Sequence, residues 1–129
     1  MSETQSPQLS HIAPVFRAID LAASVAYYRD KLLFEIRFEW KDSEAEPVRY
    51  AILGRDGIEL HLTASPDVQP SVAYCFVEDV AAYYTEVQAA GANITEAIAD
   101  QPWEMREFET KDPDGNLLIF GEHLSRLEG

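Results

Sequence analysis

The sequence contains a single cysteine, Cys75, so the chain cannot form an intramolecular disulfide bond. A domain without disulfides is compatible with a reducing compartment, and we expect a cytoplasmic protein. Cys75 lies in an apolar stretch, where a thiol behaves as a small buried hydrophobe. We therefore expect this residue to serve the packing of the core.

The sequence also lacks a long apolar segment. No run approaches the roughly 20 apolar residues that a membrane-spanning helix needs. Residues 1–8 are polar and show none of the basic, apolar and small-residue pattern of a signal sequence. We expect no membrane partner, and we expect residues 1–10 to form a flexible tail.

Basic residues are few. The sequence has 10 Lys and Arg against 23 Asp and Glu, which gives a formal net charge of −13 at pH 7. Nucleic acids and anionic membrane surfaces bind proteins through a cationic face. The charge therefore argues against nucleic acid as a partner and is compatible with a cationic one.

The 129 residues, 47% of them hydrophobic, indicate one domain with a core of its own. We expect this domain to cover residues 11–124, followed by a second tail at 125–129. Ser65–Pro70 contains two prolines and predicts a linker between two halves. The two repeats cover about residues 12–64 and 71–122.

Both halves show the same order of predicted elements. An apolar strand is followed by an Asp that can cap a helix, and the helix is followed by three strands. Placing Asp20 on Asp79 aligns the two helix starts, so each half is a βαβββ unit. One such unit cannot bury its sheet alone, so two must pair. The predicted fold class is α+β, a curved mixed β-sheet built from two βαβββ repeats with helices outside. The predicted strands are 12–19, 34–40, 48–53, 58–63, 72–77, 93–98, 105–110 and 117–121, and the predicted helices are 21–32 and 80–90.

Alternation assigns some side chains to faces of their strands. Apolar and charged residues alternate over 34–40, which predicts a half-buried strand that buries Phe34, Ile36, Phe38 and Trp40. Glu59 and His61 are two residues apart, so both face the same side of their strand.

Asp112–Asn116 is the densest run of turn residues in the chain. Pro113 fixes φ at about −65°, Gly115 can adopt a positive φ, and Asp and Asn side chains can form hydrogen bonds with neighbouring backbone groups. The flanking residues have strand character, so this run predicts a hairpin turn.

Five segments occur in a fixed order along the duplicated pattern. They are Asp20–Leu32, Gly57–Leu62, Val77–Tyr84, Trp103–Phe108 and Asp112–Asn116. Together they resemble the glyoxalase/bleomycin-resistance/extradiol-dioxygenase superfamily, which has the vicinal oxygen chelate fold. The resemblance covers about residues 12–122 and is more specific for fold than for activity.

The resemblance implies where metal ligands would lie, because the metal enzymes of this family place them on four strands. Three of the matching positions hold Ala13, Val72 and Ile119, and only the fourth strand offers candidates, Glu59 and His61. A catalytic divalent ion needs about three protein ligands. We therefore expect no metal, no cofactor and no catalytic residue, although the question of an enzyme stays open.

Among metal-free members, the sequence resembles the bleomycin-resistance-type proteins most, and these sequester a drug in a cleft at a dimer interface. Aromatic faces can hold planar or cationic groups there. Phe38 and Trp103 match the ligand-stacking positions of this subgroup best. The full set of candidate ligand-binding residues is Phe38, Trp40, Tyr50, Glu59, His61, Trp103, Met105 and Phe108.

A carboxylate in a cleft without metal needs another cation. For Glu59 this could be an amine of the ligand, or Arg17 or Arg106 of the protein. Two departures from the subgroup, Leu33 and Glu104 where it usually has Gly, are expected to reshape the mouth of the cleft.

Three functions remain open after this comparison of residues. The leading one is a non-catalytic, homodimeric small-molecule binding protein of the antibiotic-resistance type, whose ligand could be cationic and planar. The second is a glyoxalase-like or dioxygenase-like metalloenzyme with a rearranged metal site. The third is a regulatory or binding subunit with a vestigial cavity, in which the aromatic rings pack the core or an interface.

Overall fold

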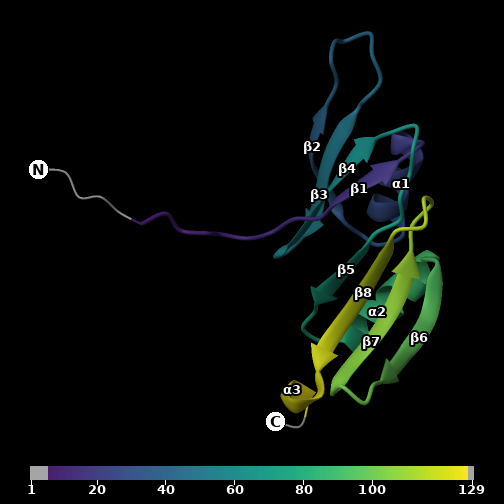
Figure 1. Ribbon diagram of the computed structural model, residues 1–129. Helices are drawn as coiled ribbons and strands as arrows, with labels where there is room; N and C mark the ends of the chain where they lie inside the picture. The colour runs from purple at the N-terminus through teal and green to yellow at the C-terminus, as the bar shows by residue number, and fades with distance from the viewer. Residues whose placement is uncertain (1–5, 128–129) are drawn as a thin grey trace, which may run out of the picture.

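Two successive βαβββ units make up residues 6–127, the part of the chain that the computed structural model describes (Figure 1). The first unit comprises β1 (Val15–Ala18), α1 (Leu21–Asp30), β2 (Glu35–Trp40), β3 (Tyr50–Arg55) and β4 (Ile58–Ala64). The second comprises β5 (Val72–Phe76), α2 (Val80–Ala90), β6 (Ile94–Asp100), β7 (Met105–Lys111) and β8 (Leu117–His123), and α3 (Leu124–Leu127) follows it. Residues 1–5 and 128–129 of the two predicted tails lie outside the described residues.

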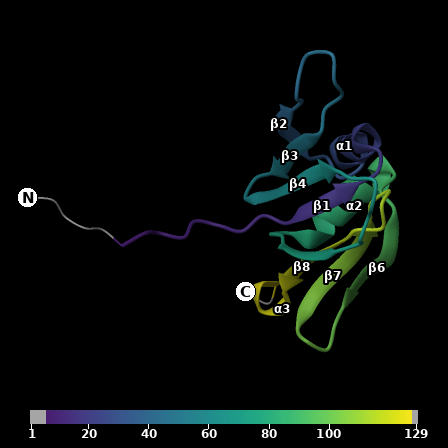
Figure 2. The same ribbon diagram turned by 45° about the horizontal axis from the view of Figure 1, so that its top comes forward.

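Each unit contributes one four-stranded mixed sheet. The strand orders are β1-β4-β3-β2 and β5-β8-β7-β6. In each sheet the first strand of the unit runs parallel to the last, and the remaining neighbours are antiparallel. Helix α1 packs on the first sheet and α2 on the second (Figures 1 and 2). The α+β class and the two βαβββ repeats are thus confirmed. No helix in residues 6–127 is long and apolar enough to cross a membrane.

Each of the two main helices begins with a capping Asp, although Asp20 is extended (φ −116°) and Asp79 is left-handed (φ 60°). Asp20 accepts a hydrogen bond from the backbone N–H of Ala23, and Asp79 accepts one from Ala82, both at 3.1 Å. Each Asp thereby satisfies a helix N–H that has no partner within its helix. The alignment of Asp20 with Asp79 therefore identified equivalent positions.

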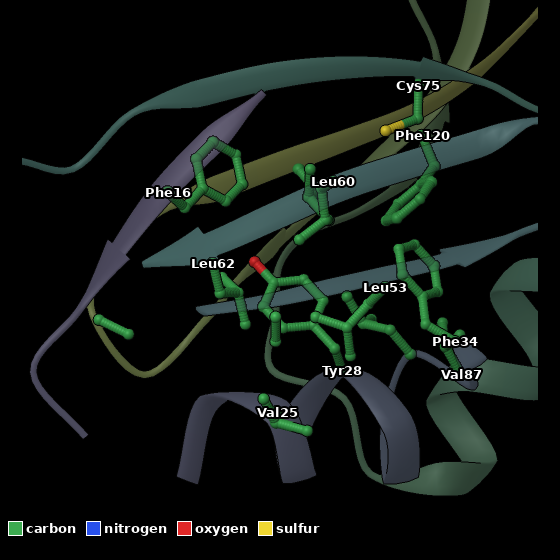
Figure 3. Close-up of a cluster of buried hydrophobic side chains, with 14 of the residues drawn as sticks. Phe16, Val25, Tyr28, Phe34, Leu53, Leu60, Leu62, Cys75, Val87 and Phe120 are labelled. Carbon is green, nitrogen blue, oxygen red and sulfur yellow. The ribbon is translucent and has the colours of Figure 1, made fainter. Parts of the chain in front are cut away.

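One hydrophobic core joins the two units. Cys75 and Phe120 of the second unit lie beside Leu60 and Phe34 of the first, as Figure 3 shows. Burial raises the pKa of the Cys75 thiol to about 12, so it stays protonated at neutral pH. The packing role expected for Cys75 agrees with this position.

The Asp112–Asn116 turn forms a buried polar cluster. The Asp112 carboxylate accepts hydrogen bonds from the Tyr28 hydroxyl (2.8 Å) and the Asn116 side-chain amide (3.0 Å). It also accepts from the backbone N–H groups of Asp114 and Asn116, both at 2.9 Å. Gly115 supplies the positive φ of 89° that closes the turn. Burial, and then the nearby charge of Asp112, raise the pKa of Tyr28, so its hydroxyl remains a donor.

The same turn attaches the second unit to the first. Asp114 accepts hydrogen bonds from the Ser24 hydroxyl (2.9 Å) and the Ile19 backbone N–H (3.1 Å) beside the start of α1. The Asn116 amide donates to the carbonyl of Arg17 at 3.3 Å. The hairpin turn predicted from the sequence is therefore also a connection between the repeats.

The corresponding β3–β4 turn of the first unit approaches α2 more loosely. Arg55 forms an ion pair with Glu86 (3.1 Å) and lies over the Tyr83 ring, 5.3 Å from its centroid. A cavity of about 620 Å³ remains between this turn, β5 and the start of α2. The β7–β8 turn and the β3–β4 turn thus occupy equivalent positions, but the β3–β4 turn leaves a cavity beside it, whereas the β7–β8 turn is held by hydrogen bonds.

The start of α2 is also capped by a buried carboxylate. Glu122 accepts hydrogen bonds from the backbone N–H groups of Asp79 and Val80, both at 3.0 Å. Burial alone would raise the pKa of Glu122. The two N–H donors and the charges of Arg126 and Arg106 outweigh burial, so the pKa is lowered.

Strand β2 differs from its predicted pattern. A register shift between Ile36 and Phe38 interrupts the alternation. Ile36 then pairs with Leu53 on the helix side, whereas Phe38 pairs with Ile52 on the other side. Every residue of β2 is exposed, so the prediction that Ile36, Phe38 and Trp40 share a buried face was wrong.

The two positions where the family usually has Gly keep a backbone that favours glycine. Leu33 has φ 62° and Glu104 has φ 66°, both in the left-handed region. A side chain at such a φ costs about 1–2 kcal/mol. The chain therefore keeps the left-handed backbone at both positions, although a non-glycine residue there lowers its stability.

The first prediction concerns Asp112. Asp112→Ala should lower the free energy of unfolding by about 2–4 kcal/mol, because it leaves several buried donors without an acceptor. Tyr28→Phe removes one donor and should cost about 1 kcal/mol. Urea unfolding at pH 7 measures both. Equal stability of wild type and Asp112→Ala would contradict this role.

The second prediction concerns pH. Glu122→Gln should lower the free energy of unfolding at pH 7 by about 1 kcal/mol, because the amide replaces a charge at a helix N-terminus. The folded pKa of Glu122 is depressed, so its stabilisation is complete above the unfolded pKa of about 4.3. It is lost as the pH falls through the lower, folded pKa. Denaturant unfolding between pH 7 and about pH 3 should show that the difference in the free energy of unfolding between wild type and variant becomes smaller as the pH falls.

The control for that experiment is Glu78→Gln. Glu78 is exposed, and its carboxylate pairs with Arg126 (2.8 Å), which also lies 3.9 Å from Glu122, whereas the hydrogen bonds from the backbone N–H groups at the start of α2 go to Glu122. It should change stability by less than about 0.5 kcal/mol at any pH. If the difference in the free energy of unfolding between wild type and Glu122→Gln stays constant as the pH falls, the charge of Glu122 does not cap the helix.

Candidate ligand-binding faces

The first sheet has one face turned away from α1, here called the first-sheet face. Strand register places these residues on it together: Val15, Phe38, Trp40, Tyr50, Ile52, Glu59 and His61. Phe38 and Trp40 are each 48% exposed, whereas Tyr50 and His61 are half-buried. Five of the eight predicted ligand-binding residues therefore share one surface.

Glu59 lies at the centre of a polar network on the first-sheet face. Arg37 is 3.3 Å from one carboxylate oxygen, and the Nε2 atoms of His11 and His61 are 3.6 and 3.9 Å from the other. The Tyr50 hydroxyl hydrogen-bonds His61 Nδ1 at 2.6 Å. The network fixes the orientation of His61 and gives Glu59 a cationic neighbour.

The cation beside Glu59 differs from those expected. Arg106 pairs instead with Asp100 at 2.7 Å, and Arg17 has its carbonyl, rather than its guanidinium, in an inter-unit contact. Arg37 reaches Glu59 because the irregularity in β2 turns it toward this face. Strict alternation places Arg37 on the face opposite Phe38, so spacing along the chain does not predict this pair.

The second sheet has a corresponding face turned away from α2, here called the second-sheet face. Register places these residues on it: Val72, Tyr74, Phe76, Glu107, Glu109, Ile119 and Gly121. Trp103 lies at its edge, in the loop before β7, and is 60% exposed. Phe76 is 62% exposed and stacks on His123, with ring centroids 5.6 Å apart.

Two aromatic side chains on this face donate hydrogen bonds to Glu107. The Tyr74 hydroxyl (2.7 Å) and Trp103 Nε1 (3.0 Å) both donate to Glu107 Oε1. Desolvation, and then the hydrogen bond to Glu107, raise the pKa of Tyr74. Sequence reasoning found Trp103 and missed Tyr74, Phe76 and Glu107. The alternation of Tyr74 with buried Cys75 was the available signal for the exposed aromatics.

One predicted ligand-binding residue, Phe108, lies on neither outer face. Phe108 is 1% exposed on the helix side of β7, where it stacks on Phe120 (5.3 Å between centroids) and contacts Tyr84 (5.0 Å). Its partner in β8 is Phe120, which belongs to the core, so Phe108 cannot line an outer face. Met105 pairs with His123 and shares the side of β7 that carries Glu107, but it is buried. We therefore remove Phe108 from the candidate set.

The residues at the family's metal positions do not fit a metal ion. The side chains of Ala13, Val72 and Ile119 have no atom that can ligate a metal ion. The Glu59 carboxylate already pairs with the Arg37 guanidinium. Within residues 6–127 no three His, Cys, Asp or Glu side chains are arranged to hold one ion. Glu59 and His61, the two candidates left, would give a divalent ion fewer than the roughly three protein ligands it needs.

Comparison with known proteins decides the family. Residues 8–120 match the family described as the Glyoxalase/Bleomycin resistance protein/Dioxygenase superfamily. The chain belongs to this superfamily. A search of curated proteins found no match.

Several solved structures share the fold at low sequence identity. TioX from Micromonospora sp. ML1 is 22% identical with a TM-score of 0.77, covering 89% of this chain and 99% of its own. The bleomycin-binding protein of bleomycin-producing Streptomyces verticillus, solved with copper(II)-bleomycin, is 25% identical with a TM-score of 0.71, covering 89% and 97%. A glyoxalase-related enzyme from Clostridium phytofermentans is 19% identical with a TM-score of 0.76, covering 93% and 99%.

The third prediction concerns metal content. Protein purified without chelator should contain less than about 0.1 divalent ion per chain by elemental analysis, because its donor set is too small for a site. Added Ni²⁺, Zn²⁺ or Mn²⁺, and added chelator, should leave the melting temperature unchanged. One tightly bound ion per chain would overturn this assignment and favour a metalloenzyme.

Proposed function

We propose that this protein is a non-catalytic binding protein of the bleomycin-resistance type. It sequesters a planar, cationic drug in an aromatic cleft at the interface of a homodimer in the cytoplasm. The observation that carries the proposal is the exposure of large aromatic side chains on both sheet faces.

The exposed aromatic residues argue for a surface that is covered in use. Phe38 and Trp40 on the first-sheet face, and Phe76 and Trp103 on the second, are each between 48% and 62% exposed. Contiguous apolar surface of this kind marks binding sites in soluble proteins. Helix-side faces of both sheets are already packed, so the outer faces are the ones free to bind.

A homodimer would turn these two open faces into clefts. If the first-sheet face of one chain lies opposite the second-sheet face of its partner, two-fold symmetry produces two equivalent clefts. Each cleft would have aromatic side chains on both walls. A planar ligand held between such walls buries both of its faces.

The chemistry of the walls favours a cation. Glu107 brings a carboxylate to the second-sheet face, where no basic side chain of residues 6–127 pairs with it, and the whole chain carries a net charge of −13. Aromatic rings add about 0.5–2 kcal/mol for a cation placed over them. The 25% identity to a protein solved with copper(II)-bleomycin supports drug binding.

The fourth prediction tests this function by calorimetry. Wild-type protein should bind at least one of metal-free bleomycin, copper(II)-bleomycin and proflavine, a planar cation. Phe38→Ala should weaken that binding by about tenfold, because it removes a stacking ring from the first-sheet face. Light scattering should give a dimer with and without ligand.

The matched control is Ile36→Ala. Ile36 lies on the same strand as Phe38 but on the helix side, beside α1. Ile36→Ala should leave the affinity for ligand unchanged. A loss of affinity in this variant would show that any damage to β2 weakens binding. Absence of heat and of a melting shift with all three ligands would refute the proposal, as would equal effects of the two substitutions.

A further inference from the structure

We infer that Glu107 is the residue that selects a cation on the second-sheet face. Tyr74 and Trp103 hold one of its carboxylate oxygens, and the other is available to a protonated nitrogen of a planar ligand. This inference rests on the proposed function and specifies the charge that the same cleft recognises.

The hydrogen bonds from the protein reach only one of the two carboxylate oxygens of Glu107. Both aromatic donors reach Glu107 Oε1, Tyr74 at 2.7 Å and Trp103 at 3.0 Å. Across the described residues 6–127, no hydrogen bond or ion pair reaches Oε2. A carboxylate oxygen held in place without a partner is suited to accept a charge-assisted hydrogen bond.

The backbone is adapted to this arrangement. Tyr74 on β5 and Glu107 on β7 lie on either side of β8, where Gly121 stands between them. A Cβ at Gly121 would collide with the Tyr74 hydroxyl. The missing side chain at Gly121 therefore allows the phenol to cross β8 and reach Glu107.

The other carboxylates near the proposed cleft lack this combination. Glu59 has Arg37 beside it at 3.3 Å, so its charge is already balanced. Glu109 lies on the same face as Glu107, but its donor is the hydroxyl of Thr95 at 2.7 Å and not an aromatic group. Glu107 combines a positioned carboxylate with flanking aromatic rings and no basic partner in the described structure.

This combination discriminates by charge. Stacking on Trp103 and Phe76 would hold any flat ring system, charged or neutral. The Glu107 carboxylate beside Trp103 adds attraction only for a cation, and the aromatic rings add to it through cation–π contact. The ligand class that fits is a planar heteroaromatic with a protonated ammonium or amidinium nitrogen.

The fifth prediction compares two probes and two substitutions. Proflavine is planar and cationic at pH 7, and acridone is planar and neutral. Glu107→Gln keeps an oxygen that can accept from Tyr74 and Trp103 but removes the charge. It should weaken proflavine binding by about tenfold and acridone binding by less than about twofold, measured by fluorescence titration.

The matched control is Glu109→Gln, which removes the same charge from the same face two residues away. It should change the affinity for either probe by less than about threefold, because screened charges without contact contribute little. Glu107→Asp draws the carboxylate back by one methylene and should give an intermediate loss for proflavine alone. Melting curves establish that each variant folds, and Glu107→Asp serves the test if Glu107→Gln does not fold.

The outcomes separate the two proposals. Wild type that binds neither probe nor bleomycin overturns the proposed function itself. Wild type that binds proflavine while Glu107→Gln binds it equally well overturns the role of Glu107 and leaves the cleft in place. An equal loss in Glu109→Gln also overturns it, because the effect would then come from overall charge.

Discussion

The hydrogen bond between the Tyr28 hydroxyl and the Asp112 carboxylate is the most buried polar contact of the turn that joins the two repeats, and on α2 the Tyr83 hydroxyl makes a second buried contact by donating to the Leu32 carbonyl at 2.7 Å. Tyr28 is fully buried in α1 of the first unit, and Asp112 begins the turn of the second. A buried polar group left without a partner costs about 1–3 kcal/mol, more than the roughly 0.5–1.5 kcal/mol that a formed hydrogen bond contributes. The pair therefore makes the docking of the two units specific, while the apolar side chains around it supply the larger part of the driving force.

The duplication explains both the site and its asymmetry. Each unit buries the helix side of its sheet and leaves the other side open, so the chain carries two open faces. The turns that link the units have diverged. The Asp112–Asn116 turn is closed by side-chain hydrogen bonds, whereas the Arg55 turn relies on an ion pair and a cation–π contact at the surface. A more open junction on one side follows from that difference in chemistry.

Local sequence signals were enough for most of the fold. Asp20 and Asp79 identified the helix starts, and the Pro and Gly of the Asp112–Asn116 turn identified the last hairpin, because capping and turn formation depend on neighbours in the chain. The errors concern properties set across strands. The register shift in β2 moved Phe38 away from Ile36, and the pairing of Phe108 with Phe120 placed it in the core. The contact of Tyr74 with Glu107 passes over a third strand, so spacing along the chain does not reveal it.

The position of the single thiol has a practical consequence. Cys75 is buried and its pKa is raised to about 12, so at neutral pH it offers almost no thiolate to alkylating reagents. A cysteine introduced on either open face would then be the only one to react, without removal of the native residue. Spectroscopic labels placed in this way, one on each face, could report the separation of the two walls in an assembled protein. The native chain is thus already prepared for distance measurements by spin or fluorescence methods.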